Sequence, residues 1–559
     1  MVTTPAEFYE RHRELLDRAI RATGARDFWS AFPESPSKSV YGEDAAPAGE
    51  RAFRDLLGRP FPIEVPGATT SVSTERSPYG VELDIAYPKG EPAALLAAAT
   101  AGVRAWRDAG PHGRAGVAAE ILTRLNGRIF EIAHAVQHTT GQAFVMAFQA
   151  GGAHAQDRGL EAVAVTLAET TRIPARSTWS KPQRSGEPPV LERTSTVAGR
   201  GIGLVIGCTT FPTWNSYPGL FASLVAGNPV IVKPHPGAVL PLAITVQVAR
   251  EVLAEAGLDP HLVGLAVEER GDGIAAELAT RPEVRIVDFT GSSEFGSWLE
   301  ANARQAVVYA EKAGLNTVVL DSTADYRGLM RNLAFSLSLY SGQMCTTPQN
   351  LLVPTGGIGT DEGQKSPAQF AADLGAALDK LLGDPKRAAG TLGAIVNDGV
   401  LARLTEAGTL PGVLHPSATI TDEQFPGAII RTPLIARLDA EDEKVYTREW
   451  FGPISFVITS ADTAHSLRLL TSTIRQHGAL TASVHSTSEE VLAAAREAAL
   501  DAGVHLAENF TGGVFVNQTA AFGDLHGTPA NPAATASLTD AAFVTGRFVT
   551  LESRREVAR

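Results

Sequence analysis

A cysteine in a loop is the first side chain in this sequence whose setting suits chemistry. Cys345 lies in SGQMCTTPQN (341–350), between a Gly-Gln turn and a Thr-Thr-Pro segment, and it follows the helical run LMRNLAFSLSLY. Backbone N–H donors around an exposed thiol lower its pKa and make the sulfur nucleophilic. A single cysteine in an apolar chain is commonly buried and inert instead, so the loop alone leaves both interpretations open.

Two strand ends carry polar groups that also suit a reactive site. Glu311 closes an apolar run in YAEKAG (309–314), where it is either solvated or a base with a raised pKa that faces a crevice. DFTGSS (288–293) places Gly and Ser where a strand turns into a helix. Backbone N–H groups at such a turn attract phosphate, although the same residues also make an ordinary helix cap.

A third polar cluster lies in CTTFPTWNSYPGLF (208–221), which follows an apolar run and leads into a helix. Cys208 at the strand end is expected to be structural, whereas Thr210 and Asn215 are candidates for contact with a reacting group. His134 and His138 are four residues apart on an expected helix, but Glu does not follow His134 and a third ligand is not evident. We therefore expect no metal site.

The elements that must position these groups alternate between strand and helix. A helical pattern with a proline in its first turn covers 240–252. This alternation predicts right-handed crossovers and a parallel sheet that is covered on both faces, with ligands at the carboxyl ends of its strands, near Cys208, Lys233 and Gly291. The expected strands are 201–208, 228–234, 262–268, 283–291 and 306–312.

The rest of the chain divides into less regular parts. A short helix is expected over 6–21, followed by an irregular, wrapping segment over 30–75 that is rich in Pro, Gly and Ser, and then by long helices over 92–175. A second α/β stretch covers 315–505, with a Gly-rich insertion at 354–364.

Composition excludes several classes of partner. The net charge of −13 offers no basic field for nucleic acid or an anionic membrane. The first residues lack the apolar core of a signal peptide, and no apolar run reaches membrane-spanning length. The two cysteines cannot form a disulfide framework, so we expect a cytoplasmic protein.

Taken together and in this order, seven stretches between about 80 and 550 resemble the aldehyde dehydrogenase superfamily. The run SPYGVELDIAYP, the N-terminal extension and the variant CTTFPTWN are most similar to its phenylacetic acid degradation branch. The resemblance implies an α/β aldehyde dehydrogenase-like fold. Its parts would be an extension (1–75), a Rossmann-like cofactor domain (76–179 and 199–311), a second α/β catalytic domain (312–510), and an oligomerisation arm and tail (180–198 and 540–559). The matching stretches are LVAGNPVIVKP, EAGLDPHLVGL, VDFTGSSEFG, YAEKAG, SGQMCTTPQN, REWFGPI and GGVFVN.

The resemblance also implies roles for individual residues. In this family a thiolate attacks the aldehyde, a hydride passes to nicotinamide, and water hydrolyses the thioester; Cys345 matches the nucleophile and Glu311 the base that activates water. The residues implied to bind the cofactor are Lys233 (adenosine ribose), Gly291 and Ser292 (pyrophosphate), and Glu449 and Phe451 (nicotinamide ribose and ring).

The oxyanion donor departs from the family's pattern. Aligning Phe211-Pro212 with the family's Phe-Pro keeps the next sixteen residues in register and places Thr210 where the family has an asparagine. Loss of an oxyanion donor costs about 3 kcal/mol in an acyl-transfer enzyme. The backbone N–H of Cys345 is expected to supply the other donor. By analogy Asn215, Tyr217 and Phe522 would face the substrate tunnel, with core packing as the alternative for each.

The resemblance and its departures also lead to expectations for the cofactor and the substrate. NAD-preferring relatives carry a Glu where this chain has Pro236, beside His235. Loss of that carboxylate removes repulsion against a 2′-phosphate, so we expect NADP, with NAD as the alternative. The branch implies a small-molecule aldehyde from aromatic catabolism, either free or carried as a CoA thioester, and a homodimer or homotetramer. The competing functions are a CoA-acylating dehydrogenase and a nucleotide-binding pseudoenzyme.

Overall fold

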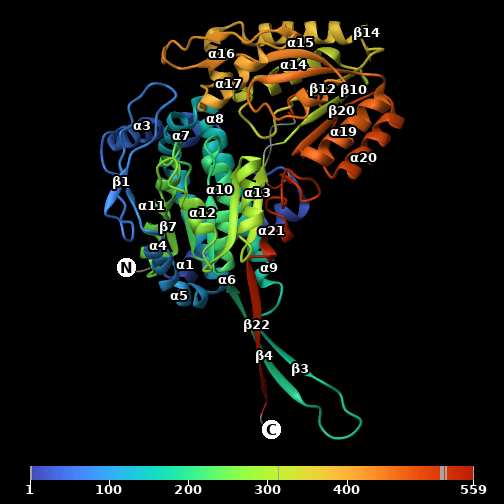
Figure 1. The fold of residues 1–559 in the computed structure, drawn as a ribbon. Helices are drawn as coiled ribbons and strands as arrows, with labels where there is room; N and C mark the ends of the chain where they lie inside the picture. The colour runs from blue at the N-terminus through green and yellow to red at the C-terminus, as the bar shows by residue number, and fades with distance from the viewer. Residues whose placement is uncertain (1–2, 313, 516–521, 523–524, 558–559) are drawn as a thin grey trace.

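Two sheets with their flanking helices and one projecting arm make up the molecule (Figure 1). The computed structural model describes residues 3–312, 314–515, 522 and 525–557. The part of the chain that it describes contains no helix that is both long and apolar enough to cross a membrane.

The first sheet has five parallel strands in the order β7-β6-β5-β8-β9. Side chains alternate between its faces: Val205 packs against helices α6, α10 and α11, whereas its neighbours Leu204 and Ile206 face α4, α12 and α13. Burial on both faces is why these strands are almost continuously apolar. All five strands expected from the sequence are confirmed. They span Ile202–Ile206 (β5), Val230–Lys233 (β6), Val263–Leu265 (β7), Val284–Gly291 (β8) and Val307–Lys312 (β9).

The helices around this sheet include those predicted from periodicity. The prediction over 240–252 is confirmed by α11, and the long helices over 92–175 are also present. The bounds are Pro92–Ala101 (α4), Val103–Asp108 (α5), Gly110–Gly127 (α6), Ile129–Thr140 (α7), Phe144–Met146 (α8), the π-helical turn Ala147–His154 (η1), Ala155–Thr171 (α9), Pro212–Ala226 (α10), Leu240–Glu255 (α11), Ile274–Ala279 (α12) and Ser293–Asn302 (α13).

The N-terminal segment is more ordered than the sequence indicated. Helix α1 (Pro5–Ala25) starts at a Thr4–Glu7 capping box and packs against α6 and α9. The irregular segment expected over 30–75 contains helices α2 (Lys38–Tyr41) and α3 (Ala45–Leu56), so that expectation was wrong in part. The only fully buried side chain of α3 is Phe53, which stacks on His138 at 5.1 Å. A helix with one anchor has too weak a periodic pattern to be recognised.

The second sheet has seven strands in the order β15-β18-β19-β12-β10-β20-β21. All neighbours are parallel except the edge pair β15 and β18. Helices α14 (Tyr326–Ser338) and α15 (Pro367–Leu382) cover one face, and α19 (Thr463–His477) and α20 (Glu489–Ala502) cover the other. The strands span Thr317–Leu320 (β10), Asn350–Pro354 (β12), Val413–His415 (β15), Leu434–Asp439 (β18), Ile454–Ser460 (β19), Thr481–His485 (β20) and His505–Glu508 (β21). The Gly-rich insertion forms the hairpin of β13 (Ile358–Thr360) and β14 (Gly363–Lys365).

The arm is an antiparallel sheet of β3 (Arg176–Ser180), β4 (Val190–Gly199) and β22 (Phe548–Glu556), and it extends away from the body (Figure 1). A buried ion pair anchors its base. Arg547 donates to both carboxylate oxygens of Asp288 on β8, at 2.7 and 2.6 Å, and to Ser223 at 2.8 Å. Its side chain is fully buried, so the pair joins the tail to the first sheet.

Replacement of Arg547 with Ala is expected to lower the free energy of unfolding by about 3–5 kcal/mol, because Asp288 would stay buried without its counter-charge. Chemical denaturation followed by circular dichroism measures this. Arg554→Ala is the matched control, because that side chain is 65% exposed on the same tail, and its cost should stay within about 0.5 kcal/mol. Equal costs for the two variants would contradict the anchoring role.

Candidate active site

Two cavities meet at Cys345. The larger, of about 650 Å³, lies at the carboxyl ends of the first sheet's strands, and the smaller, of about 380 Å³, lies toward α8, η1 and α14. Phe211, Asn215 and Cys345 line both. A thiol at this junction can contact one molecule from each side, which suits transfer of a group between two bound compounds.

A strained turn holds the cysteine loop. Tyr340 and Ser341 both have left-handed backbone angles, with φ of 53° and 48°, where non-glycine residues are rare. The Tyr340 hydroxyl donates to the Thr140 carbonyl, and Ser341 donates to the carbonyls of Leu392 and Arg431 at 3.1 and 3.0 Å. These bonds fix a costly conformation immediately before Cys345, as is typical of functional sites.

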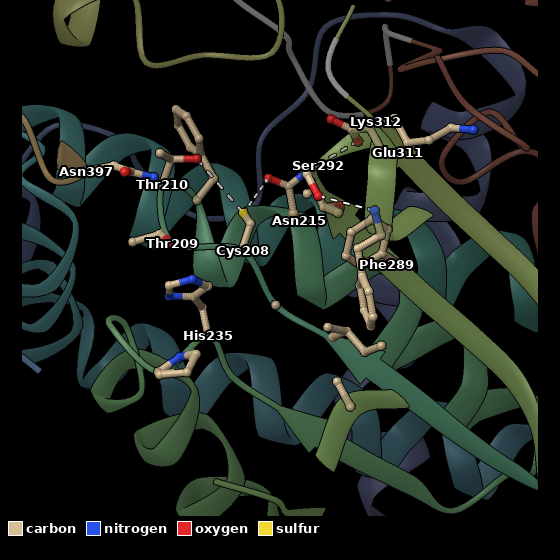
Figure 2. Close-up of a pocket in the computed structure, with 18 of the residues that line it drawn as sticks. Cys208, Thr209, Thr210, Asn215, His235, Phe289, Ser292, Glu311, Lys312 and Asn397 are labelled. Carbon is tan, nitrogen blue, oxygen red and sulfur yellow. Dashed lines mark hydrogen bonds between the residues drawn. The ribbon is translucent and has the colours of Figure 1, made fainter. Parts of the chain in front are cut away.

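The Glu311 carboxylate is the centre of the polar cluster beside the thiol. The Nδ2 of Asn215 donates to Oε2 at 3.2 Å, and the Nε2 of His526 lies 3.2 Å from Oε1. Figure 2 shows Asn215 between Cys208 and Glu311, at the end of β9. Cys345 Sγ, His526 Nε2 and a Glu311 oxygen all lie within 4.8 Å of one another. The cluster therefore brings together a nucleophile, a carboxylate and an imidazole.

Opposite charge effects act on the two predicted catalytic groups. Burial alone would raise the pKa of Glu311, but the charge and hydrogen bond of His526 outweigh it and hold that pKa below its usual value. Burial, and then the Glu311 charge, raise the pKa of Cys345 well above its usual value. The thiol is thus not activated by backbone donors as the sequence suggested, because desolvation and the adjacent carboxylate prevail. At neutral pH the site holds a thiol next to a carboxylate that can accept its proton.

The predicted cofactor residues line the larger cavity together. Gly291 and Ser292 lie at the end of β8, where the Ser292 hydroxyl accepts from the Phe295 N–H and caps α13. Glu449 and Phe451 line the end of the cavity near Cys345. Burial raises the pKa of Glu449 to about 7, with only partial opposition from Arg403. A carboxyl group kept in a cavity in this way suits a hydrogen bond to a ligand hydroxyl.

At the other end of the cavity, Lys233 forms an ion pair with Glu268, which follows β7. Glu268 also accepts from the Ile274 N–H at 2.9 Å, so its carboxylate is fixed. Burial, and then the Lys233 and Arg270 charges, lower the pKa of the nearby His235 to about 4. This end of the cavity therefore carries a carboxylate paired with a lysine, next to a neutral imidazole.

Thr210 and Asn215 differ in their surroundings. Thr210 lines the larger cavity, with its hydroxyl 4.0 Å from the Cys208 sulfur and its carbonyl bonded to Gln142 at 2.7 Å. Asn215 contacts Glu311 and lines both cavities, which agrees with a place beside the substrate. Burial raises the pKa of Cys208 to about 11, so this second thiol is inert. The role of Thr210 as oxyanion donor stays a prediction.

Two residues expected in the tunnel lie in the core. Tyr217 is fully buried and its hydroxyl is 2.9 Å from the Thr245 hydroxyl, between α10 and α11. Phe522 is also fully buried and its ring packs on Trp29 of the N-terminal segment at 4.9 Å. Neither is among the described residues that line the two cavities. The analogy misplaced them because helical phase and a left-handed Phe522 backbone (φ of 66°) turn both side chains into the core.

Sequence reasoning missed His526 and Glu268. His526 lies in a Gly- and Pro-rich stretch, 181 residues after Cys345, without a local motif to distinguish it. The sequence placed Glu268 at the end of an expected strand and gave it no functional role. Its role follows from the order β7-β6-β5, which sets it beside Lys233. Strand adjacency was the signal that could have found Glu268.

Comparisons with known proteins agree with this geometry. Residues 88–523 match the sequence model of the aldehyde dehydrogenase family. A crystal structure of an NAD-dependent aldehyde dehydrogenase from Burkholderia multivorans superposes with a TM-score of 0.97, at 54% identity over 100% of both chains. A 1-pyrroline-5-carboxylate dehydrogenase from Bacillus subtilis is 24% identical over 81% of this chain and 85% of its own. An alpha-ketoglutaric semialdehyde dehydrogenase 2 from Azospirillum brasilense is 31% identical over 60% of this chain and 63% of its own.

Replacement of Glu311 with Gln is expected to speed alkylation of Cys345 by iodoacetamide about tenfold near neutral pH. The negative charge of Glu311 raises the pKa of the thiol, so its removal lowers that pKa, and each unit multiplies the thiolate fraction by ten. Mass spectrometry of the labelled peptide gives the rate. Cys208→Ser is the control and should leave the rate unchanged. Slower labelling in E311Q than in wild type would show that the carboxylate does not oppose ionisation of the thiol.

Proposed function

The chain belongs to the aldehyde dehydrogenase family, and on that premise we propose that it oxidises an aldehyde to the carboxylic acid through a thioester on Cys345. It has the fold of this family and is an oxidoreductase that acts on aldehydes. The observation that carries the residue assignment is the position of Cys345 at the junction of two cavities, beside the Glu311 carboxylate.

The residues of the larger cavity fit a nicotinamide dinucleotide. Glu449 is a buried carboxyl group that faces the cavity, Lys233 and Glu268 form a charged pair at the opposite end, and Ser292 and Gly291 lie between these ends at a helix start. When bound, the cofactor supplies the hydride acceptor. The protein's part is to hold its ribose hydroxyls and phosphates so that the ring lies next to Cys345.

The protein's own groups account for the remaining steps. The Cys345 sulfur forms a bond to the carbonyl carbon, and the developing oxyanion accepts from the Cys345 N–H and from the Thr210 hydroxyl. After loss of the hydride, the acyl group is held as a thioester. Glu311 then accepts a proton from water at a carboxylate oxygen, and the resulting hydroxide displaces the thiolate and releases the acid.

The rim of the larger cavity favours NAD. Pro236 replaces one carboxylate, but Glu268 brings another against Lys233 from the neighbouring strand. A fixed carboxylate accepts from a ribose 2′-hydroxyl and repels a 2′-phosphate. His235 is neutral at pH 7, so it gives a 2′-phosphate no charge, although Arg270 lies at the same rim. We therefore propose NAD, with NADP as the alternative. The NAD dependence of the Burkholderia multivorans protein supports this choice.

The smaller cavity indicates an apolar aldehyde. Its walls are largely aromatic and aliphatic, and they also include His154, whose Nε2 lies 2.6 Å from a Glu34 carboxylate oxygen. The aromatic and aliphatic residues include Trp214, Phe335, Leu339, Met344 and Phe515. About 380 Å³ is too small to enclose CoA as well as an acyl chain, so a CoA-linked semialdehyde of aromatic catabolism would have to extend outside. We propose a semialdehyde of aromatic catabolism as the substrate, with its aldehyde and apolar chain in this cavity and its second carboxyl group, free or as a CoA thioester, outside it.

Apolar side chains on the arm support a homodimer or homotetramer. Trp179 on β3 is 38% exposed, and Val549 and Leu551 on β22 are 42% and 61% exposed; β4 lies between these two strands. Exposed apolar side chains of this kind are typical of a surface that packs against a second copy. The cytoplasmic location stays a prediction.

Wild type is expected to reduce NAD in the presence of an aromatic or aliphatic aldehyde, and Cys345→Ala is expected to have no detectable turnover. Absorbance of the reduced nicotinamide measures both, and product analysis with and without CoA separates the acid from an acyl-CoA. Acyl-CoA as the sole product would establish the acylating alternative. Nucleotide binding without turnover of any aldehyde would establish a pseudoenzyme.

Replacement of Glu268 with Gln is expected to lower the ratio of kcat/KM for NAD to that for NADP by about tenfold or more, because repulsion of the 2′-phosphate is lost. Initial rates with each cofactor give the ratio. Glu269→Gln is the matched control, because that neighbouring side chain is exposed and should leave the ratio unchanged. An unchanged ratio in E268Q would remove Glu268 from cofactor selection.

A further inference from the structure

The imidazole of His526 lies beside Glu311 and Cys345, but it has no part in the catalytic steps proposed above. Its Nε2 lies 3.2 Å from Glu311 Oε1 and 4.0 Å from Cys345 Sγ. The side chain is 4% exposed and its ring contacts the Trp214 ring edge-on at a centroid distance of 4.8 Å. Its carbonyl accepts from the Leu538 N–H at 2.9 Å. Ring and backbone are therefore both held in place.

The hydrogen bond to the Glu311 carboxylate determines which nitrogen of the His526 imidazole carries a proton. An ionised carboxylate can only accept hydrogen bonds, so Nε2 must be protonated where it meets Glu311. The same argument orients Asn215, whose Nδ2 donates to the other carboxylate oxygen. A single N–H thus points at an acceptor oxygen and lies close to the reactive sulfur.

We propose that His526 is a catalytic residue whose Nε2–H stabilises the Cys345 thiolate. The S–H bond of Cys345 breaks, its proton forms an O–H bond with Glu311, and the electron pair stays on sulfur. Glu311 releases this proton to solvent before it accepts the proton of the hydrolytic water. The neutral carboxyl group is then a weaker acceptor, and the Nε2–H donates to the sulfur anion instead. Charge-assisted bonds of this kind are about twice as strong as neutral ones.

The other charged and titratable groups around the Cys345 thiol do not stabilise its thiolate form. Glu311 on β9 opposes ionisation of the thiol, whereas Cys208 after β5, with a pKa of about 11, carries no charge near neutral pH. Arg158 on α9 lies over the Trp214 ring, and its charge acts on Glu311. The Cys345 backbone N–H also lowers the pKa of the thiol, and among the side chains around it His526 places its Nε2 4.0 Å from the sulfur.

The pH dependence of Cys345 alkylation by iodoacetamide tests the proposal on the full-length protein. His526→Ala is expected to raise the apparent pKa of Cys345 by about one unit, because a thiolate donor is lost. Alkylation below that pKa should then be about tenfold slower. His526→Gln keeps an N–H donor and should show a smaller shift. Circular dichroism and thermal melting establish that each variant is folded, and H526Q carries the comparison with wild type if H526A does not fold.

Two further comparisons separate a direct role from an indirect one. His505→Ala is the matched control, because His505 Nε2 lies 2.9 Å from the Gly527 carbonyl and supports the same segment without facing the sulfur. H505A should leave the pH profile unchanged. In an E311Q background, H526A should still raise the pKa of the thiol.

The proposal is overturned by an unchanged profile in H526A, by an equal shift in H505A, or by disappearance of the H526A effect in E311Q. The last outcome would make His526 a positioning residue for Glu311. The inference rests on the proposed role of Cys345 as nucleophile, but alkylation needs neither aldehyde nor nucleotide. A protein that labels as expected and yet oxidises no aldehyde would refute the proposed function and leave the role of His526 in thiol ionisation intact.

Discussion

The buried negative charge of Glu311 is the constraint on which the rest of the active site depends. A carboxylate taken out of water becomes neutral unless donors replace the water that it has lost. Asn215 and His526 provide such donors, one to each oxygen. The price of keeping that charge beside Cys345 is a thiol whose pKa lies well above its usual value. Acceptance of the thiol proton by Glu311 moves the buried negative charge from the carboxylate to the sulfur, where the Nε2 of His526 lies 4.0 Å away.

The fold makes this cluster possible by bringing together parts of the chain that are far apart. Glu311 is the next-to-last residue of β9 in the first sheet, Asn215 lies in the first turn of α10 after β5, and Cys345 precedes β12 of the second sheet. His526 comes from the segment that returns from the second sheet toward the tail. The carboxyl ends of parallel strands share one edge of a sheet, so polar groups placed there converge even when their positions in the sequence do not. The strained turn before Cys345 then fixes the sulfur against that edge.

The sequence allowed the sheet and most of the site to be predicted, and the failures have physical causes. Strands buried on both faces appear in the sequence as continuous apolar runs, which is why β5 to β9 and the convergence of Cys208, Lys233 and Gly291 were predicted. The prediction of an irregular segment over 30–75 was wrong in part because α3 buries a single side chain, which gives no helical periodicity in the sequence. Tyr217 and Phe522 were placed by analogy, whereas their direction depends on helical phase and on a left-handed backbone angle. Glu268 and His526 depend on strand adjacency and on a long return of the chain, neither of which a local pattern records.

The low polarity that raises the pKa of the thiol also makes it sensitive to single charges. Charges and hydrogen-bond donors interact more strongly where water is excluded than in water. The Glu311 carboxylate lies within 4.8 Å of the Cys345 sulfur, and His526 Nε2 lies 4.0 Å from that sulfur. Transfer of one proton from sulfur to carboxylate therefore changes the balance from repulsion to attraction without any movement of the backbone. A site built in this way keeps its thiol protonated at rest and still allows it to ionise when a substrate carbonyl is in place.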